Sequence, residues 1–199
     1  MSEELRAKWN IRHAEAEDIG EAPTVLRDHL HLLPPTGNAL DLACGRGAGA
    51  LLLASRGLRV QAWDLSEVAV GRLAEEAQRR GLTNIHTQVR DVICEPPEPR
   101  SFDLILVSFF LERALATHLI AALRPGGLLF YQTFTRAAVS SRGPSNPQYR
   151  LDDNELLRMF SGLHLRFYRE EGLLGDLEAG CRDVAMLVGE KPGRERERV

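Results

Sequence analysis

Cysteine, tryptophan and long apolar runs are scarce in this chain of 199 residues. The three cysteines, Cys44, Cys94 and Cys181, are widely separated and form no Cys-x-x-Cys pair. Neither a disulfide framework nor a zinc site is expected from such a set. No apolar run approaches the roughly 18 residues that cross a bilayer, and the N-terminus lacks the pattern of a secretory signal. We therefore expect a cytoplasmic protein without a metal and without a membrane partner.

An excess of positive charge is also absent. The chain has 25 Lys and Arg residues against 28 Asp and Glu, for a formal net charge of −3, and the two signs are interspersed. Binding to a nucleic-acid backbone needs a broad cationic surface, so nucleic acid is not expected as a partner. The length and the 44% hydrophobic content fit one globular domain, placed at residues 1–190. Residues 191–199 are charged and predicted to be a disordered tail, and the oligomeric state is left open.

Short apolar runs alternate with amphipathic segments along the chain. Strands are predicted at residues 39–42, 59–63, 85–89, 104–108, 128–133, 163–169 and 184–188. Helices are predicted at residues 23–33, 47–56, 67–80 and 112–123, and a capping box of Asp152 and Glu155 predicts one more. This alternation indicates an α/β fold, in which helices cover both faces of a largely parallel sheet.

A glycine turn followed by a carboxylate is the most informative feature. The apolar run that ends at Leu42 leads into Gly45 and Gly47, and a small-residue helix follows. Glycine at such a turn lets a ligand approach the main chain closely. Asp64 ends the next apolar run, where its carboxylate can accept hydrogen bonds from both hydroxyls of a ribose. The pattern predicts a nucleoside-cofactor site. Because Gly45-x-Gly47-x-x-Ala50 also fits a dinucleotide turn, NAD or NADP stays open at this point.

The string Asp41-Leu-Ala-Cys-Gly-Arg-Gly47 resembles motif I of the class I S-adenosylmethionine-dependent methyltransferases. The resemblance implies a Rossmann-like three-layer sandwich, with a seven-stranded, mostly parallel sheet and an antiparallel C-terminal hairpin strand. It implies S-adenosylmethionine as cofactor, with Asp41 near the methionine end, Asp64 on the ribose, and Asp91 with Val92 at the adenine. The remaining cofactor-binding residues that we predict are Trp9, Ala43, Cys44, Gly45, Gly47, Leu65 and Ser108.

A narrower similarity points to the tellurite-resistance type of small methyltransferase. It is carried by Trp9 in the N-terminal segment, by Ala62-Trp-Asp64 and by the short chain. The sequence departs from that type at Leu174-Gly-Asp-Leu177, where a His-Arg pair is expected in the final hairpin. This departure puts tellurium chemistry in doubt.

Several assignments have a plain structural alternative. Cys44 fits a space-filling role better than that of a nucleophile, because no histidine stands in a recognisable partner motif. Trp9 either anchors the N-terminal segment on the domain surface or closes over the site, so residues 1–20 are a possible lid. Residues 135–150 are predicted to cover the substrate. Within that loop, Arg142 and Arg150 suit an anionic acceptor, unless they simply face solvent.

The function predicted from the sequence is methyl transfer to a small molecule: a thiol, a metalloid oxyanion or a small acid. No catalytic residue is assigned, since in-line displacement on a sulfonium depends mainly on alignment and exclusion of water. Two alternatives remain. An NAD(P)-dependent oxidoreductase is disfavoured because no Tyr-x-x-x-Lys pair occurs. A non-catalytic cofactor-binding domain would retain cofactor affinity without turnover.

Overall fold

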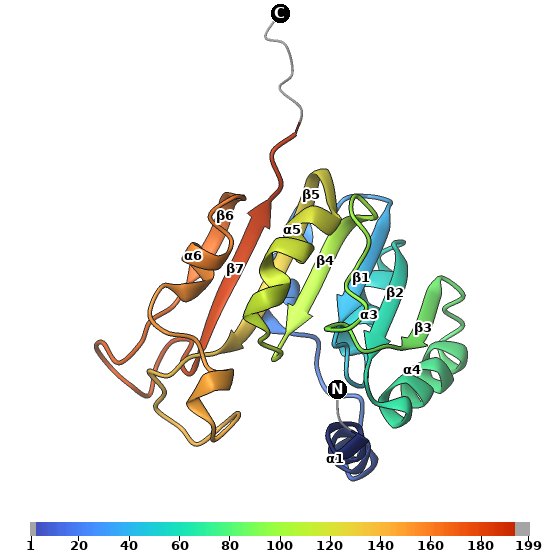
Figure 1. Cartoon of the computed structure of the whole chain (residues 1–199), viewed down its shortest axis with the longest axis horizontal. Coiled ribbons are helices and arrows are strands. Elements are labelled where there is room, and N and C mark those ends of the chain that lie inside the picture. Colours follow the sequence, from blue (N-terminus) through green and yellow to red (C-terminus); the bar gives the residue numbers. More distant parts are fainter. Residues whose placement is uncertain (1–2, 194–199) are drawn as a thin grey trace, which may run out of the picture.

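A mixed seven-stranded sheet of order β3-β2-β1-β4-β5-β7-β6 forms the centre of the molecule (Figure 1). The structure is a computed structural model and describes residues 3–193. The strands are β1 (Asn38–Leu42), β2 (Arg59–Asp64), β3 (Ile85–Val89), β4 (Phe102–Ser108), β5 (Leu123–Phe134), β6 (His164–Arg169) and β7 (Val184–Glu190). The first five are mutually parallel, whereas β7 is antiparallel to both β5 and β6. The predicted fold class, including the antiparallel C-terminal hairpin strand, is confirmed.

Helices cover both faces of the sheet, and each face has its own apolar core. The helices are α1 (Glu3–Ala14), α2 (Thr24–Arg27), α3 (Ala48–Ser55), α4 (Glu67–Arg79), α5 (Ala116–Ala122) and α6 (Glu155–Met159). On one face, buried residues of α2, α3 and α4 pack on the sheet, and on the other, α5 and α6 do so. Because β1 and β4 are central, they are covered on both sides and read as nearly continuous apolar runs.

Two predicted helices are shorter than expected. Residues 23–33 form α2 and then a separate 3-10 turn, Leu30–Leu32, and residues 113–115 are likewise 3-10 before α5 begins. The predicted capping box is only half formed. The carboxylate of Glu155 accepts the Asp152 amide at 2.8 Å, but the Asp152 side chain forms an ion pair with Arg136 at 2.5 Å. Asn154, in a left-handed conformation, is the residue that precedes α6.

Residues at the C-terminal end are ordered further than predicted. Lys191, assigned to the tail, exchanges backbone hydrogen bonds with Gly126 and Gly127. Its ammonium group donates to the carbonyls of Ala121 and Leu123 at 3.1 and 2.7 Å. Residues 194–199 of the predicted disordered segment lie outside the described residues. Within residues 3–193, no helix is long and apolar enough to pass through a bilayer.

Candidate functional site

The candidate site lies where the carboxyl ends of β1, β2 and β4 meet, at the lower edge of the sheet in Figure 1. In the parallel register, Leu42 of β1 lies beside Trp63 of β2 and Val107 of β4. The predicted cofactor residues that follow these strands are therefore neighbours in space. Open α/β sheets bind ligands at this edge, where the strand order reverses around the first strand.

The glycine turn is tied to the second strand by Asp64. The Asp64 carboxylate accepts the Gly45 amide at 2.7 Å through Oδ2 and the Ser66 amide at 2.8 Å through Oδ1. The side chain is mostly buried, with a residue exposure of 8%. Each carboxylate oxygen can accept more than one hydrogen bond, so both retain capacity for ligand donors. Asp64 thus holds the glycine turn in place, and its carboxylate oxygens can still accept hydrogen bonds from a ligand.

The two predicted turn glycines serve different purposes. Both have left-handed backbone angles, with φ of 53° at Gly45 and 80° at Gly47. A Cβ on Gly47 would lie 2.4 Å from a methyl group of Leu73 in α4, so that glycine is required by the protein's own packing. A Cβ on Gly45 would meet only the ring of His13, at 3.3 Å. Gly45 is therefore the position where the main chain is left accessible to a ligand.

Asp41 is a buried carboxyl without enough partners. It is 1% exposed, and among the described residues its Oδ1 has no hydrogen-bond partner. Burial raises the pKa of Asp41 to about 8, the amide of Ala50 opposes that rise, and the negative charge of Asp64 adds to it. Buried polar atoms are nearly always paired, so an orphaned carboxyl oxygen beside a glycine turn indicates a missing ligand group. This observation fits the predicted place of Asp41 near the cofactor.

The thiol of Cys44 is buried beneath the turn. Burial raises its pKa, and the neighbouring carboxylates Asp41 and Asp64 raise it further. A thiol in such surroundings is poorly ionised and a weak nucleophile. The geometry supports the space-filling role expected from the sequence. Ala43 beside it takes a left-handed conformation, with φ of 53°, and packs against the core on the other face of the sheet.

The remaining predicted positions surround the same edge. Leu65 follows Asp64 and is half-buried, and Val92 is buried in the core near β4. Asp91 accepts the amides of Ile93 and Cys94 at 3.0 and 3.3 Å. Although partial burial acts to raise the pKa of Asp91, these amides lower it overall. Asp91 consequently shapes the turn after β3.

The N-terminal helix α1 lies beside Gly45 of the turn and the start of α4, at the site where the sequence placed a possible lid. The Ser66 hydroxyl donates to the Asn10 side chain at 2.7 Å, and Arg72 donates to the carbonyls of His13 and Ala16 at 2.6 and 2.5 Å. Trp9 stacks on His13 with ring centroids 5.8 Å apart. No described residue of α1 is fully buried, so polar contacts rather than a shared core hold this helix in place.

His13 is the α1 side chain that comes closest to the turn. Burial lowers its pKa, the Asp64 carboxylate opposes that shift, and the nearby cations Arg46, Arg12 and Arg72 lower it further. At neutral pH the imidazole is therefore held in its uncharged form. Figure 1 shows α1 set below the sheet edge, beside α4.

Residues 135–150 form a loop that several hydrogen bonds hold in place. Asp183 accepts the amides of Val139 and Ser140 at 2.6 and 3.2 Å, and also the Ser140 hydroxyl. Arg150 donates to the carbonyls of Thr135 and Pro144 at 2.9 and 2.8 Å, and to that of Arg142. The guanidinium of Arg150 is thus occupied within the loop. The structure does not direct it to an acceptor, and the predicted role of Arg150 in binding an anion loses its geometric basis.

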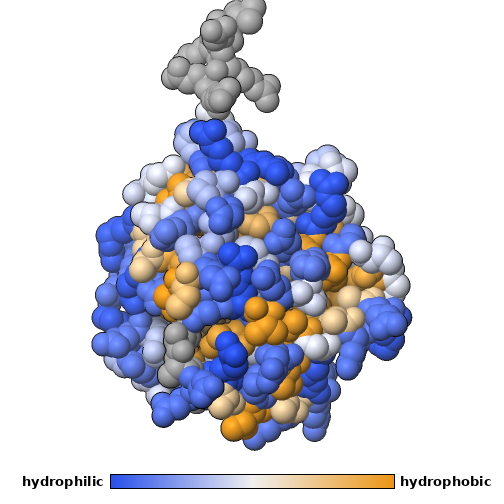
Figure 2. Space-filling model, turned by 45° about the vertical axis from the view of Figure 1, so that its right-hand side comes forward, coloured by the Kyte–Doolittle hydropathy of each residue, from blue (hydrophilic) through white to orange (hydrophobic). Residues whose placement is uncertain are grey.

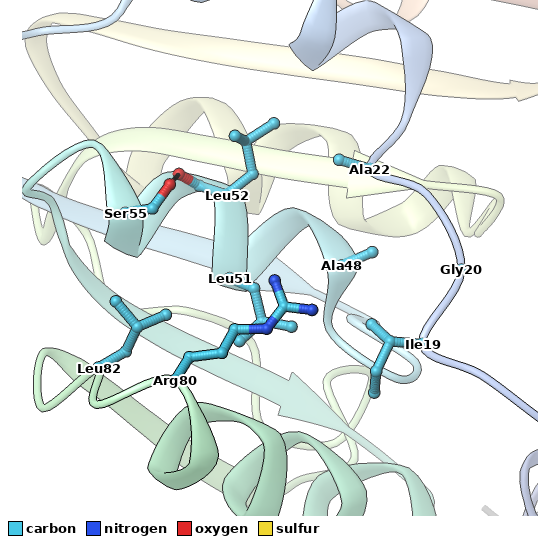
Figure 3. A pocket seen from close by; sticks show the side chains of 9 residues that line it. All are labelled: Ile19, Gly20, Ala22, Ala48, Leu51, Leu52, Ser55, Arg80 and Leu82. Carbon is cyan, nitrogen blue, oxygen red and sulfur yellow. Dashed lines mark hydrogen bonds between the residues drawn. The ribbon is translucent and has the colours of Figure 1, made fainter.

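A hollow on the outer side of α3, of about 380 Å³, is separate from this site (Figure 3). It is lined by apolar residues of the 19–22 segment, α3 and the end of α4, with the Arg80 side chain running along Leu51. Arg80 is paired with Glu76 at 2.6 Å. None of the predicted cofactor residues lines this hollow.

Comparison with known proteins agrees with the fold and the turn. Residues 39–127 match the methyltransferase domain family. The chain is 30% identical over 104 residues to a ubiquinone biosynthesis O-methyltransferase of Coxiella burnetii, and the match spans 50% of this chain and 44% of that protein. This chain thus covers less than half the length of that relative. The family match, over residues 39–127, includes motif I and the strands β2, β3 and β4.

Solved structures share the architecture. A SAM-dependent methyltransferase from Aquifex aeolicus aligns with a TM-score of 0.68 at 16% identity, covering 93% of this chain and 97% of that one. TehB from Haemophilus influenzae aligns with a TM-score of 0.68 at 22% identity, covering 83% of this chain and 61% of that one. The match of residues 39–127 to the methyltransferase domain family and the shared fold of these structures confirm the resemblance to the class I S-adenosylmethionine-dependent methyltransferases that motif I indicated. The likeness to TehB is a likeness of fold.

Proposed function

We propose that this chain binds S-adenosylmethionine at the turn between Asp41 and Asp64 and transfers its methyl group to a small-molecule acceptor. The observation that carries the proposal is the junction of Gly45 with Asp64, whose carboxylate fixes the turn at 2.7 Å and retains acceptor capacity. Asp41 lies at the same edge of the sheet, and its Oδ1, which has no hydrogen-bond partner among the described residues, is further support for a ligand at this site. The antiparallel β7 argues against the oxidoreductase alternative, because it gives the sheet of the methyltransferase class.

Each residue has a defined task in this proposal. When bound, S-adenosylmethionine supplies an electrophilic methyl group on a sulfonium. Asp64 would accept the ribose hydroxyls, Gly45 would let the cofactor lie against the main chain, and Asp41 would face its polar methionine end. Leu65, Asp91 and Val92 would border the adenine, and Ser108 would lie near the transferred methyl group. The protein then mainly aligns the reactants and keeps water out.

Of the two candidate lids, the geometry favours the N-terminal segment over the 135–150 loop as the cover of the cofactor site. Residues 1–20 include α1, which touches the glycine turn through His13 and is held by few polar contacts. A helix with no fully buried residue can be displaced at little cost, whereas the 135–150 loop is tied at several points. We propose that α1, with Trp9 and His13, closes over the cofactor. The small-molecule acceptor is in keeping with the named relatives, which are methyltransferases of ubiquinone biosynthesis.

Calorimetry with S-adenosylhomocysteine tests the proposal. Asp64→Ala removes the ribose acceptor, and hydrogen bonds to a charged group contribute about 1.5 to 3 kcal/mol each, so losing two weakens binding by roughly a hundredfold or more. Asp64→Asn keeps one acceptor oxygen and should lose less. Glu75→Ala, which removes the same charge from an exposed position on α4, is the matched control and should bind normally. Unchanged affinity in a folded Asp64→Ala protein would refute the assignment.

A further inference from the structure

Two phenylalanine rings lie in contact at the carboxyl ends of β4 and β5, the first two strands on one side of β1. Phe109 follows β4 and Phe134 ends β5, with ring centroids 4.9 Å apart at an interplanar angle of 36°. The register places this pair beside the site, since Val107 of β4 lies next to Leu42 of β1, just before the turn. Phe109 is 42% exposed, so part of its ring is presented to a ligand.

The backbone of Phe109 has an unfavourable conformation that displays this ring. Its φ is 55°, in the left-handed region that bulky residues rarely adopt, and its amide donates to the Gln132 carbonyl at 2.8 Å. Left-handed conformations in large residues carry a cost and are found mainly at functional sites. The neighbouring Phe110 is half-buried, and its carbonyl accepts the Tyr131 hydroxyl at 2.8 Å, so the chain is fixed on both sides of Phe109.

Phe134 is held rigidly beneath the exposed ring. A Cβ on Gly143 would lie 2.7 Å from the Phe134 ring, so that glycine lets the 135–150 loop close directly against it. The guanidinium of Arg150 lies 5.6 Å from the Phe134 centroid while its nitrogens bind loop carbonyls.

The positive charges nearby are already occupied. Arg113 pairs with Glu155 at 2.6 Å and donates to the carbonyls of Gln148 and Arg150. Arg136 pairs with Asp152 at 2.5 Å. With Arg150 bound inside its loop, these three arginines hold the protein together and have little to offer an anion. Figure 2 shows hydrophobic residues gathered on the lower part of the molecule, the end where the parallel strands terminate in Figure 1.

We propose that Phe109 and Phe134 form an aromatic platform for the methyl acceptor, and that the acceptor is an uncharged molecule with a planar ring. This inference rests on the proposed function, because it takes the end of β4 to be the point of methyl transfer. Aromatic rings stack on one another with offset geometry at centroid distances like that of this pair. Ser108 ends β4 directly before Phe109, and its hydroxyl, which has no hydrogen-bond partner among the described residues, is the group that we propose binds a polar substituent of the ring.

The test uses the full chain with S-adenosylhomocysteine bound and 4-methylcatechol as the probe, followed by saturation-transfer NMR. We expect the probe to bind and its affinity to fall about tenfold in Phe109→Ala and in Phe134→Ala. Phe109→Gly is a second variant that tests whether a loss of binding comes from misfolding. Glycine readily adopts the left-handed angle of this position, so the variant should remain folded and still fail to bind the probe. Leu165→Ala, an exposed apolar position on β6, is the control and should bind the probe as the parent does.

The outcomes separate this inference from the proposed function. If the phenylalanine variants bind S-adenosylhomocysteine normally and lose the probe, the platform is supported. If 4-methylcatechol does not bind, or binds equally well to the variants, the platform is wrong while cofactor binding stands. Faster methyl transfer to tellurite or mercaptoacetate than to 4-methylcatechol also overturns it. Absence of S-adenosylhomocysteine binding in the parent protein refutes the proposed function itself.

Discussion

Replacing the buried Asp41 with asparagine should make the protein's stability much less dependent on pH. In the folded chain, burial raises the pKa of Asp41 from its ordinary value of 3.8 to about 8. Between these two values the folded protein keeps a proton on Asp41 that the unfolded chain has released. Because the folded state binds more protons there, the free energy of unfolding falls as the pH rises, and it levels off above the folded-state pKa.

The size of the effect follows from the shift. A shift of about four pKa units at about 1.36 kcal/mol per unit gives up to about 5 kcal/mol of stability lost between acidic and alkaline conditions. Asp41→Asn removes the charge at every pH. Its buried amide introduces donors that cost about 1 to 3 kcal/mol, but this cost is the same throughout the pH range. The variant should therefore be less stable than the parent at roughly pH 4 and more stable at roughly pH 9.

Urea unfolding at a series of pH values measures this directly. The parent and Asp41→Asn curves of unfolding free energy against pH should cross, with the parent curve falling more steeply. Glu75→Gln, at an exposed position on α4, is the control and should run parallel to the parent. Parallel curves for the parent and Asp41→Asn would show that Asp41 is ionised in the folded protein, and the argument from its burial would fail.

Three further predictions concern the surroundings of the site. Gly47→Ala should destabilise the protein by about 1 to 3 kcal/mol, measured by urea unfolding, because its Cβ meets Leu73 and its φ is 80°; stability equal to the parent's would contradict this packing. Arg150→Ala should speed amide exchange across residues 135–150, whereas Arg142→Ala should not, since of these two arginines Arg150 is the one whose guanidinium binds loop carbonyls. Exchange in α1 should slow when S-adenosylhomocysteine binds, while the 135–150 loop changes little; protection confined to that loop would instead make it the lid.

Much of the architecture was predictable because its signals are local. Apolar runs marked the strands, and the observed β3 has the predicted bounds of residues 85–89. The helix boundaries at Leu30 and Arg113 were not predictable, since 3-10 turns there arise from packing on the sheet. The capping box at Asp152 failed for a similar reason: a distant partner, Arg136, takes its carboxylate.

The sequence by itself determined the class of site, because a glycine turn and a strand-terminal acid lie within one β-α-β unit. Gly45 and Asp64 are 19 positions apart, and parallel pairing of β1 with β2 brings them into contact. Tertiary structure alone decided how the site is enclosed. The positions of α1 over Gly45, of Arg150 inside its loop and of Phe109 on Phe134 depend on contacts between distant segments. No periodicity records such contacts, since they arise only when the sheet brings the strand ends together.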